Sequence, residues 1–319
     1  MKKQVTSIIF VLVAAILYAI NIPLSKLLLK HIEPAMMAAY LYLGAGLGIG
    51  IVFLMTKKQK QVESEAFTKK DLIYVLGMII LDIIAPILLM FGLLDSASTN
   101  ASLLNNFEIV CTSLIALFLF KEVISKRMWL AVFLITLSSL VLSFEDITTF
   151  KFSWGAILVL LSTLCWGFEN NCTRNLSNKN TFYVVFIKGI CSGIGSLLVA
   201  LLIKEQFASF KYIIFALALG FVAYGLSIFF YIKAQAVIGA SKTSAYYSVA
   251  PFIGTFLSFV IFHEKLLWSY FVGLAIMIMG TIIVVIDTLD KSHRYKHIAT
   301  QVYDLYNYPY DIKNISENK

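Results

Sequence analysis

The sequence predicts an all-α membrane protein with ten transmembrane helices, built as two inverted five-helix repeats. Three observations carry this prediction. Hydrophobic residues make up 60% of the 319 residues and charged residues only 14%, whereas a soluble domain carries about 25% charged residues. The apolar residues form long uninterrupted blocks, and the first half of the chain matches the second half at a nearly constant spacing.

Ten apolar blocks are long enough to be considered as membrane spans, because a helix needs about 20 residues to cross the hydrocarbon core. They cover residues 5–28, 34–55, 72–93, 98–120, 128–144, 153–174, 182–203, 213–235, 241–262 and 266–287. The fifth block is short and ends at Phe144, before Glu145 and Asp146. Transmembrane β-strands are excluded, because they need only about ten residues of alternating polarity.

Lysine and arginine are distributed unevenly between the two ends of these blocks. With the N-terminus in the cytoplasm, nineteen basic residues lie on the cytoplasmic side and six on the opposite side, while Lys188 lies inside a block. Basic loops stay in the cytoplasm, so we expect a multi-pass protein of the cell membrane with both termini inside. The net charge of +8 is then a sign of orientation, and we expect no nucleic-acid partner.

The two halves of the chain repeat each other. Glu122 follows the fourth block and Glu264 follows the ninth, and the flanking residues match around this pair without a gap. Nearer the start of each half, Tyr18 aligns with Trp166 and Lys26 with Arg174. The spacing between these pairs is six residues longer than that between Glu122 and Glu264, because the loop at 56–71 is six residues longer than its counterpart at 203–212. Because five spans per half is an odd number, the second half enters the membrane from the opposite side.

These boundaries predict three regions. Residues 1–146 form the first five-helix repeat and residues 147–287 form the second. Residues 288–319 form a polar cytoplasmic tail rich in Tyr, Asn and Lys. We expect this tail to be solvated and partly disordered, because terminal polar segments are rarely held by a core.

Three segments resemble a known family. They are residues 96–104 (Ser-Ala-Ser-Thr-Asn-Ala-Ser-Leu-Leu), residues 239–246 running on through Ala250-Pro251 to Glu264, and residues 166–171 (Trp-Gly-Phe-Glu-Asn-Asn). The sequence is similar here to the drug/metabolite transporter superfamily, in particular to EamA-type permeases, and the resemblance covers residues 5–287. It implies the two-repeat fold and transport, mostly export, of amino acids, drugs, sugars or other metabolites. Proteins of this family often have a proline in this span of each repeat. Pro251 fits that pattern in the second half, but the equivalent residue in the first half is Ile109.

Four ionisable residues lie inside the apolar blocks: Asp82, Glu108, Glu169 and Lys188. Such groups are costly in a membrane unless they face a partner or water, so each is a candidate site residue. We expect Glu108 and Glu169 to bind an amino group or a proton, and Lys188 to pair with one of them or with a solute carboxylate. For Asp82, which lies near Pro86, a structural role is the alternative to a role in the substrate site.

Uncharged polar and aromatic residues complete the predicted substrate site. We expect hydrogen bonds from Asn21, Asn105, Asn170, Tyr224 and Tyr247, and an apolar or cation–π wall from Trp166. For each amide or tyrosine taken alone, a role in joining helices is the alternative.

We expect a secondary transporter that exports amino acids or related small polar metabolites by alternating access, with proton coupling through a carboxylate. A multidrug or sugar carrier, including a nucleotide-sugar carrier, is the alternative within transport, and a receptor or scaffold is the alternative outside it. No phosphate-binding loop or hydrolase triad is present, so we expect no enzyme and no cofactor. All four histidines, His31, His263, His293 and His297, lie outside the blocks, so we expect no metal site. The expected partners are a small-molecule substrate and the lipid bilayer, and a homodimer is left open.

Overall fold

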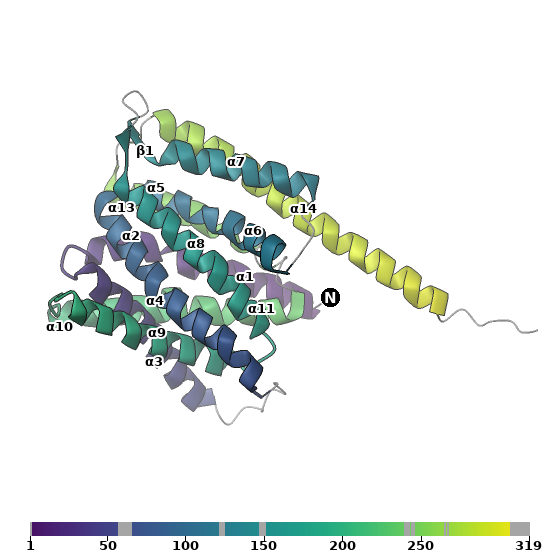
Figure 1. Cartoon of the computed structure of the whole chain (residues 1–319), viewed down its shortest axis with the longest axis horizontal. Coiled ribbons are helices and arrows are strands. Elements are labelled where there is room, and N and C mark those ends of the chain that lie inside the picture. The colour runs from purple at the N-terminus through teal and green to yellow at the C-terminus, as the bar shows by residue number, and fades with distance from the viewer. Residues whose placement is uncertain are drawn as a thin grey trace, which may run out of the picture.

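A computed structural model describes residues 2–56, 66–120, 125–146, 151–238, 243, 246–264, 266 and 268–306, and the architecture is helical (Figure 1). The first half contains α1 (Lys2–Ala19), α2 (Asn21–Leu28), α3 (Pro34–Thr56), the 3-10 turn η1 (Lys69–Asp71), α4 (Leu72–Asp95), α5 (Ser98–Leu104), the 3-10 turn η2 (Asn105–Phe107), α6 (Glu108–Phe120) and α7 (Lys126–Leu142). The second half contains α8 (Trp154–Asn175), α9 (Thr181–Leu202), α10 (Phe210–Gly220), the π-helical turn η3 (Phe221–Leu226), α11 (Ser227–Ile238), α13 (Ala250–Phe262) and α14 (Trp268–Tyr306).

The described residues include six helical segments long and apolar enough to cross a bilayer. These are Lys3–Leu28, Pro34–Thr56, Lys69–Asp95, Thr181–Leu202, Phe210–Ile238 and Trp268–Asp287. Their outward surfaces carry large apolar side chains, such as Met55 and Trp268, which are 79% and 81% exposed. A surface of this kind needs lipid around it, so the chain is a multi-pass membrane protein.

The other four predicted blocks are helical but shorter, interrupted or more polar. The block at 98–120 is interrupted by η2, α7 has 17 residues, and α13 has 13. The helix α8 is long enough at 22 residues but carries Glu169, Asn170 and Asn171. For these four blocks a complete membrane crossing stays a prediction.

Each half of the chain packs its helices against the other half. The contacting pairs include α3 with α9, α4 with α8, α1 with α11, α5 with α13, and α7 with α14. In repeat order, the second, fourth and fifth helices pair with their own counterparts, and each first helix pairs with the third helix of the other half. Figure 1 shows α7 and α14 side by side along one edge of the bundle.

Glycines allow α3 and α9 to approach closely. A Cβ atom on Gly189 would lie 2.3 Å from the backbone nitrogen of Gly46, and one on Gly46 would lie 2.7 Å from the nitrogen of Ile190. Small residues at a helix interface permit this backbone contact in membranes. The pair therefore forms a tightly packed interface between the halves.

Carboxylates of the second half cap helices of the first half at one end of the bundle. Glu264 accepts hydrogen bonds from the backbone nitrogens of Ser98 and Thr99 at 2.8 and 3.0 Å, and from the Thr99 hydroxyl at 2.6 Å. Glu205 accepts from the backbone nitrogens of Ala35 and Met36 at 3.1 and 2.7 Å. The charge distribution predicts that this is the outer end. The repeat equivalent of Glu264, Glu122, lies outside the described residues.

Two features differ from the prediction. A short antiparallel pair of strands, β1 (Phe144–Asp146) and β2 (Lys151–Phe152), joins α7 to α8. The helix α14 passes the predicted boundary at 288 without a break and ends at Tyr306, as Figure 1 shows. The segment from 288 to 306 is polar but contains neither Gly nor Pro, so nothing in it ends a helix. Residues 307–319 of the predicted tail lie outside the described residues.

Candidate functional site

A cavity of about 100 Å³ lies between the two halves. Its walls come from α1, α3, η2, α6, α8, α9, η3, α11 and the start of α13. The lining residues are Tyr18, Tyr42, Asn105, Asn106, Glu108, Ile109, Trp166, Glu169, Asn170, Thr173, Lys188, Tyr224, Ile228, Tyr231, Ile232, Tyr247, Ser248, Ala250 and Pro251. Glu108 lies ten residues after the start of α5, which at 1.5 Å per residue is about 15 Å, or half the bilayer core.

Several helices are irregular where they line or adjoin the cavity. The turn η2 separates α5 from α6, the π-helical turn η3 separates α10 from α11, and a break at Ile20 separates α1 from α2. The helix α13 begins at the cavity, with Ala250 and Pro251 in its first turn. In membrane proteins irregular backbone is tolerated where it is buried in protein or lines a polar cavity, and π-helical turns are frequent at functional sites.

The carboxylate of Glu108 projects into this cavity from the first residue of α6. Asn170 on α8 donates a hydrogen bond from Nδ2 to Glu108 Oε1, and the same nitrogen lies 3.4 Å from the Thr112 hydroxyl. No ion pair of Glu108 is found among the described residues. A partly buried carboxylate that lines a cavity and has an amide as its neighbour is open to a proton or to a cationic solute.

The ammonium group of Lys188 lies between two other carboxylates. Its Nζ is 3.1 Å from Asp82 Oδ2 and 2.8 Å from Glu169 Oε1. Tyr42 donates a hydrogen bond to Asp82 Oδ1 at 2.7 Å, and Thr173 donates one to Glu169 Oε1. The charged side chains are buried: those of Lys188, Asp82 and Glu169 are 6%, 0% and 3% exposed. This triad joins α4, α8 and α9, and it satisfies Lys188 within the protein.

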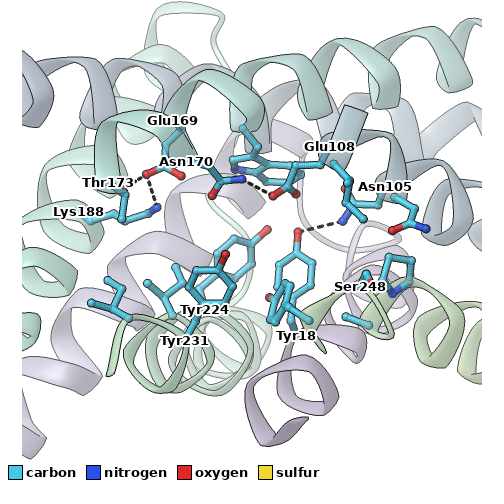
Figure 2. A pocket seen from close by; sticks show the side chains of 18 of the residues that line it. Tyr18, Asn105, Glu108, Glu169, Asn170, Thr173, Lys188, Tyr224, Tyr231 and Ser248 are labelled. Carbon is cyan, nitrogen blue, oxygen red and sulfur yellow. Dashed lines mark hydrogen bonds and ion pairs between the residues drawn. The ribbon is translucent and has the colours of Figure 1, made fainter. Parts of the chain in front are cut away.

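The opposite wall of the cavity is aromatic. The ring centroid of Tyr18 lies 5.8 Å from those of Tyr224 and Tyr247, and the Tyr247 ring lies 5.0 Å from that of Tyr231. Asn21 donates a hydrogen bond to the Tyr224 hydroxyl at 3.0 Å. Figure 2 shows Glu108 and Asn170 on one side and Tyr18 and Tyr224 on the other, with tyrosine hydroxyls directed toward the acidic wall.

With this geometry established, comparisons with known proteins identify the family. The model of the EamA-like transporter family matches residues 5–144 and again residues 153–286. The chain belongs to the EamA-like transporter family. Because one family model matches both halves, the protein has a two-repeat architecture.

Curated relatives of this EamA-like protein are described as transporters. An uncharacterized transporter of Methanothermobacter thermautotrophicus is 26% identical over 296 residues, covering 88% of this chain and 85% of that protein. The uncharacterized transporter YyaM of Bacillus subtilis is 24% identical over 179 residues, covering 53% of this chain and 59% of that protein. A solved crystal structure superposes with a TM-score of 0.65 at 14% identity, covering 89% of this chain and 97% of that one, and so shares the fold. The protein is accordingly a member of a membrane transporter family.

The structure brings most of the predicted residues of this EamA-like transporter to one place. Eight line the cavity: Asn105, Glu108, Trp166, Glu169, Asn170, Lys188, Tyr224 and Tyr247. Asn21 and Asp82 lie behind the wall, where Asn21 holds Tyr224 and Asp82 holds Lys188 and Tyr42. Their roles in binding a substrate remain predictions.

Sequence reasoning missed several lining residues. They are Tyr18, Tyr42, Asn106, Ile109, Thr173, Ile228, Tyr231, Ile232, Ser248, Ala250 and Pro251. The signal that could have identified Tyr18 is its alignment in the repeat with Trp166, a predicted site residue. The tyrosines at 42 and 231 carry no such signal, because tyrosine in an apolar helix is equally suited to the membrane interface.

Proposed function

We propose that this protein is a secondary transporter that carries a small amino-bearing solute through the cavity by alternating access and exports it from the cell. Glu108 exchanges a proton for the solute, so that the proton gradient drives transport. The observation that carries this proposal is a partly buried carboxylate that faces a cavity between two repeats and has an amide as its neighbour. Secondary transporters of inverted-repeat architecture bind their solutes at such an interface near the midplane.

The closed contacts at the predicted outer end support alternating access. Glu264 and Glu205 of the second half hold the first turns of α5 and α3 of the first half. Lys26 donates a hydrogen bond to the carbonyl of Ser96 at the same end. In this proposal, export requires these contacts at the predicted outer end to separate.

Flux into proteoliposomes tests the proposal. The purified full chain is reconstituted, a pH gradient is imposed, and uptake is measured for a panel of labelled amino acids and amines, with an internal pH-sensitive dye reporting proton movement. We expect counterflow of protons and solute with the wild type, and flux at the level of empty liposomes with Glu108→Gln.

Asp71→Asn is the matched control, because Asp71 is a carboxylate outside the cavity that pairs with Lys179 at 3.0 Å. Its flux should equal that of the wild type. Wild-type flux from a folded Glu108→Gln variant would contradict the coupling role of Glu108, and absence of flux for the entire panel would contradict transport of amino-bearing solutes.

A further inference from the structure

The charges around the cavity favour a solute that carries net positive charge. Among the described residues that line the cavity or stand directly behind it, the acids are Asp82, Glu108 and Glu169, and the basic residue is Lys188. Lys188 is shared between Asp82 and Glu169 at 3.1 and 2.8 Å. The negative charge of Glu108 is therefore not balanced by a basic side chain in this part of the structure.

The same arrangement disfavours a solute carboxylate. To bind one, Lys188 would have to leave a buried carboxylate without its partner, and breaking a buried ion pair is strongly unfavourable. A carboxylate placed elsewhere in the cavity would face Glu108 or Glu169, and like charges at close range repel in a low-dielectric site. The sequence suggested Lys188 as a group for a solute carboxylate, but its two protein partners occupy it.

Two buried amide oxygens at the turn η2 lack a hydrogen-bond donor among the described residues. Asn105 Oδ1 and Asn106 Oδ1 have no hydrogen-bond partner among the described residues, although both side chains are at least 96% buried and both line the cavity. Their Nδ2 atoms are already committed, to the Tyr18 hydroxyl and the Thr281 hydroxyl at 3.4 and 2.7 Å. Buried acceptors of this kind are normally satisfied, so a ligand with several N–H groups would complete them.

The aromatic wall suits the apolar body of such a ligand. Tyr18, Tyr224 and Tyr231 lie on the opposite side of the cavity from Glu108 and Asn105 (Figure 2), and Tyr247 also lines the cavity. Tyrosine rings pack against apolar groups and also attract cations through their faces. The cavity thus combines an acceptor wall for an ammonium head with an aromatic wall for its carbon skeleton.

From this geometry we infer that the solute is a small organic amine: a primary or secondary ammonium group on an apolar body, without a carboxylate. This inference rests on the proposed function, since it concerns the same cavity, and it narrows the expected amino-bearing solutes to free amines. A quaternary ammonium ion satisfies the charge of Glu108 but offers no N–H group to Asn105 and Asn106. An amino acid offers the N–H groups but adds a carboxylate that has no partner.

Three probes with a common phenylethyl body separate these classes. Binding of phenethylamine, trimethyl(phenethyl)ammonium and phenylalanine to the purified full chain is measured by isothermal titration calorimetry in detergent. We expect phenethylamine to bind most tightly, and the quaternary ion about tenfold more weakly, because one or two hydrogen bonds worth about 1 kcal/mol each are lost. Phenylalanine should bind at least about tenfold more weakly than phenethylamine, since its carboxylate remains unpaired.

Asn105→Leu provides a second readout. This variant removes one acceptor while keeping a side chain of similar size. Phenethylamine should therefore bind several-fold more weakly, and the affinity for the quaternary ion should be nearly unchanged. Thermal unfolding of each variant confirms that it is folded.

The outcomes distinguish the inference from the proposed function. Phenylalanine binding as tightly as phenethylamine, or a quaternary ion that binds most tightly, overturns the amine assignment while leaving Glu108-dependent transport intact. Failure of all three probes to bind the wild type also overturns it, and the flux panel then decides the proposed function separately. Phenethylamine binding that is unchanged by Glu108→Gln overturns both.

Discussion

Replacing Lys188 by methionine should destabilise the protein strongly. The substitution removes the cation that lies 3.1 Å from Asp82 and 2.8 Å from Glu169, and it leaves both carboxylates buried without a counter-charge. Removing one partner of a buried ion pair costs about 3–5 kcal/mol. Because all three charged groups are 6% exposed or less, solvent screening reduces this cost little. We therefore expect Lys188→Met to lower the free energy of unfolding by about 3–5 kcal/mol.

The free energy of unfolding is measured by denaturant titration in mixed micelles, followed by tryptophan fluorescence. The triple variant Lys188→Met, Asp82→Asn, Glu169→Gln removes all three charges together, and it should recover most of the lost stability because no isolated charge remains. Lys211→Met is the control, since Lys211 is exposed and its loss should change stability by less than about 0.5 kcal/mol. A Lys188→Met variant within about 1 kcal/mol of the wild type would refute the triad as an obligate buried network.

Two further predictions concern contacts between the halves. Gly189→Val should prevent stable folding, because its Cβ would lie 2.3 Å from the Gly46 nitrogen; a monodisperse, wild-type-like elution profile with an unchanged melting temperature would contradict this packing. Glu264→Ala should speed amide hydrogen exchange at Ser98 and Thr99 about tenfold, because a lost helix cap costs about 1 kcal/mol or somewhat more. Glu264→Gln keeps one acceptor oxygen and should give an intermediate rate, and equal exchange in all three proteins would show that the cap does not hold α5.

The charged part of the site could be predicted from the sequence, but which carboxylates pair with Lys188 could not. Glu108, Glu169 and Lys188 stand out because ionisable residues are rare inside apolar blocks. Which of them meet depends on helix rotation and depth, and the sequence contains neither. The pairing of Lys188 with both Asp82 and Glu169 arises only when α4, α8 and α9 come together. Of the two roles expected for Lys188, the structure shows the pairing with a carboxylate, Glu169, and it adds Asp82 as a second partner.

The helix positions followed from the apolar blocks, whereas their irregularities did not. No Gly or Pro marks the turn η2 at Asn105–Phe107, and a single Gly225 lies in the π-helical turn η3. Such turns depend on the hydrogen bonds and packing that surrounding helices supply, so local propensity does not reveal them. The polar composition of residues 288–306 indicated exposure to water, but exposure does not specify conformation, and the segment is helical.

The exchange of helix partners between the halves bears on how the protein is made. During synthesis α1, α3 and α7 enter the membrane before α11, α9 and α14, against which they pack, have left the ribosome. Until then, the small and polar faces of the early helices, such as the glycine-containing face of α3, lack their helix partners and contact lipid or an insertion chaperone instead. Assembly of the first half is completed only by the last helices to arrive, so truncation near the C-terminus should leave an unassembled protein that is open to degradation.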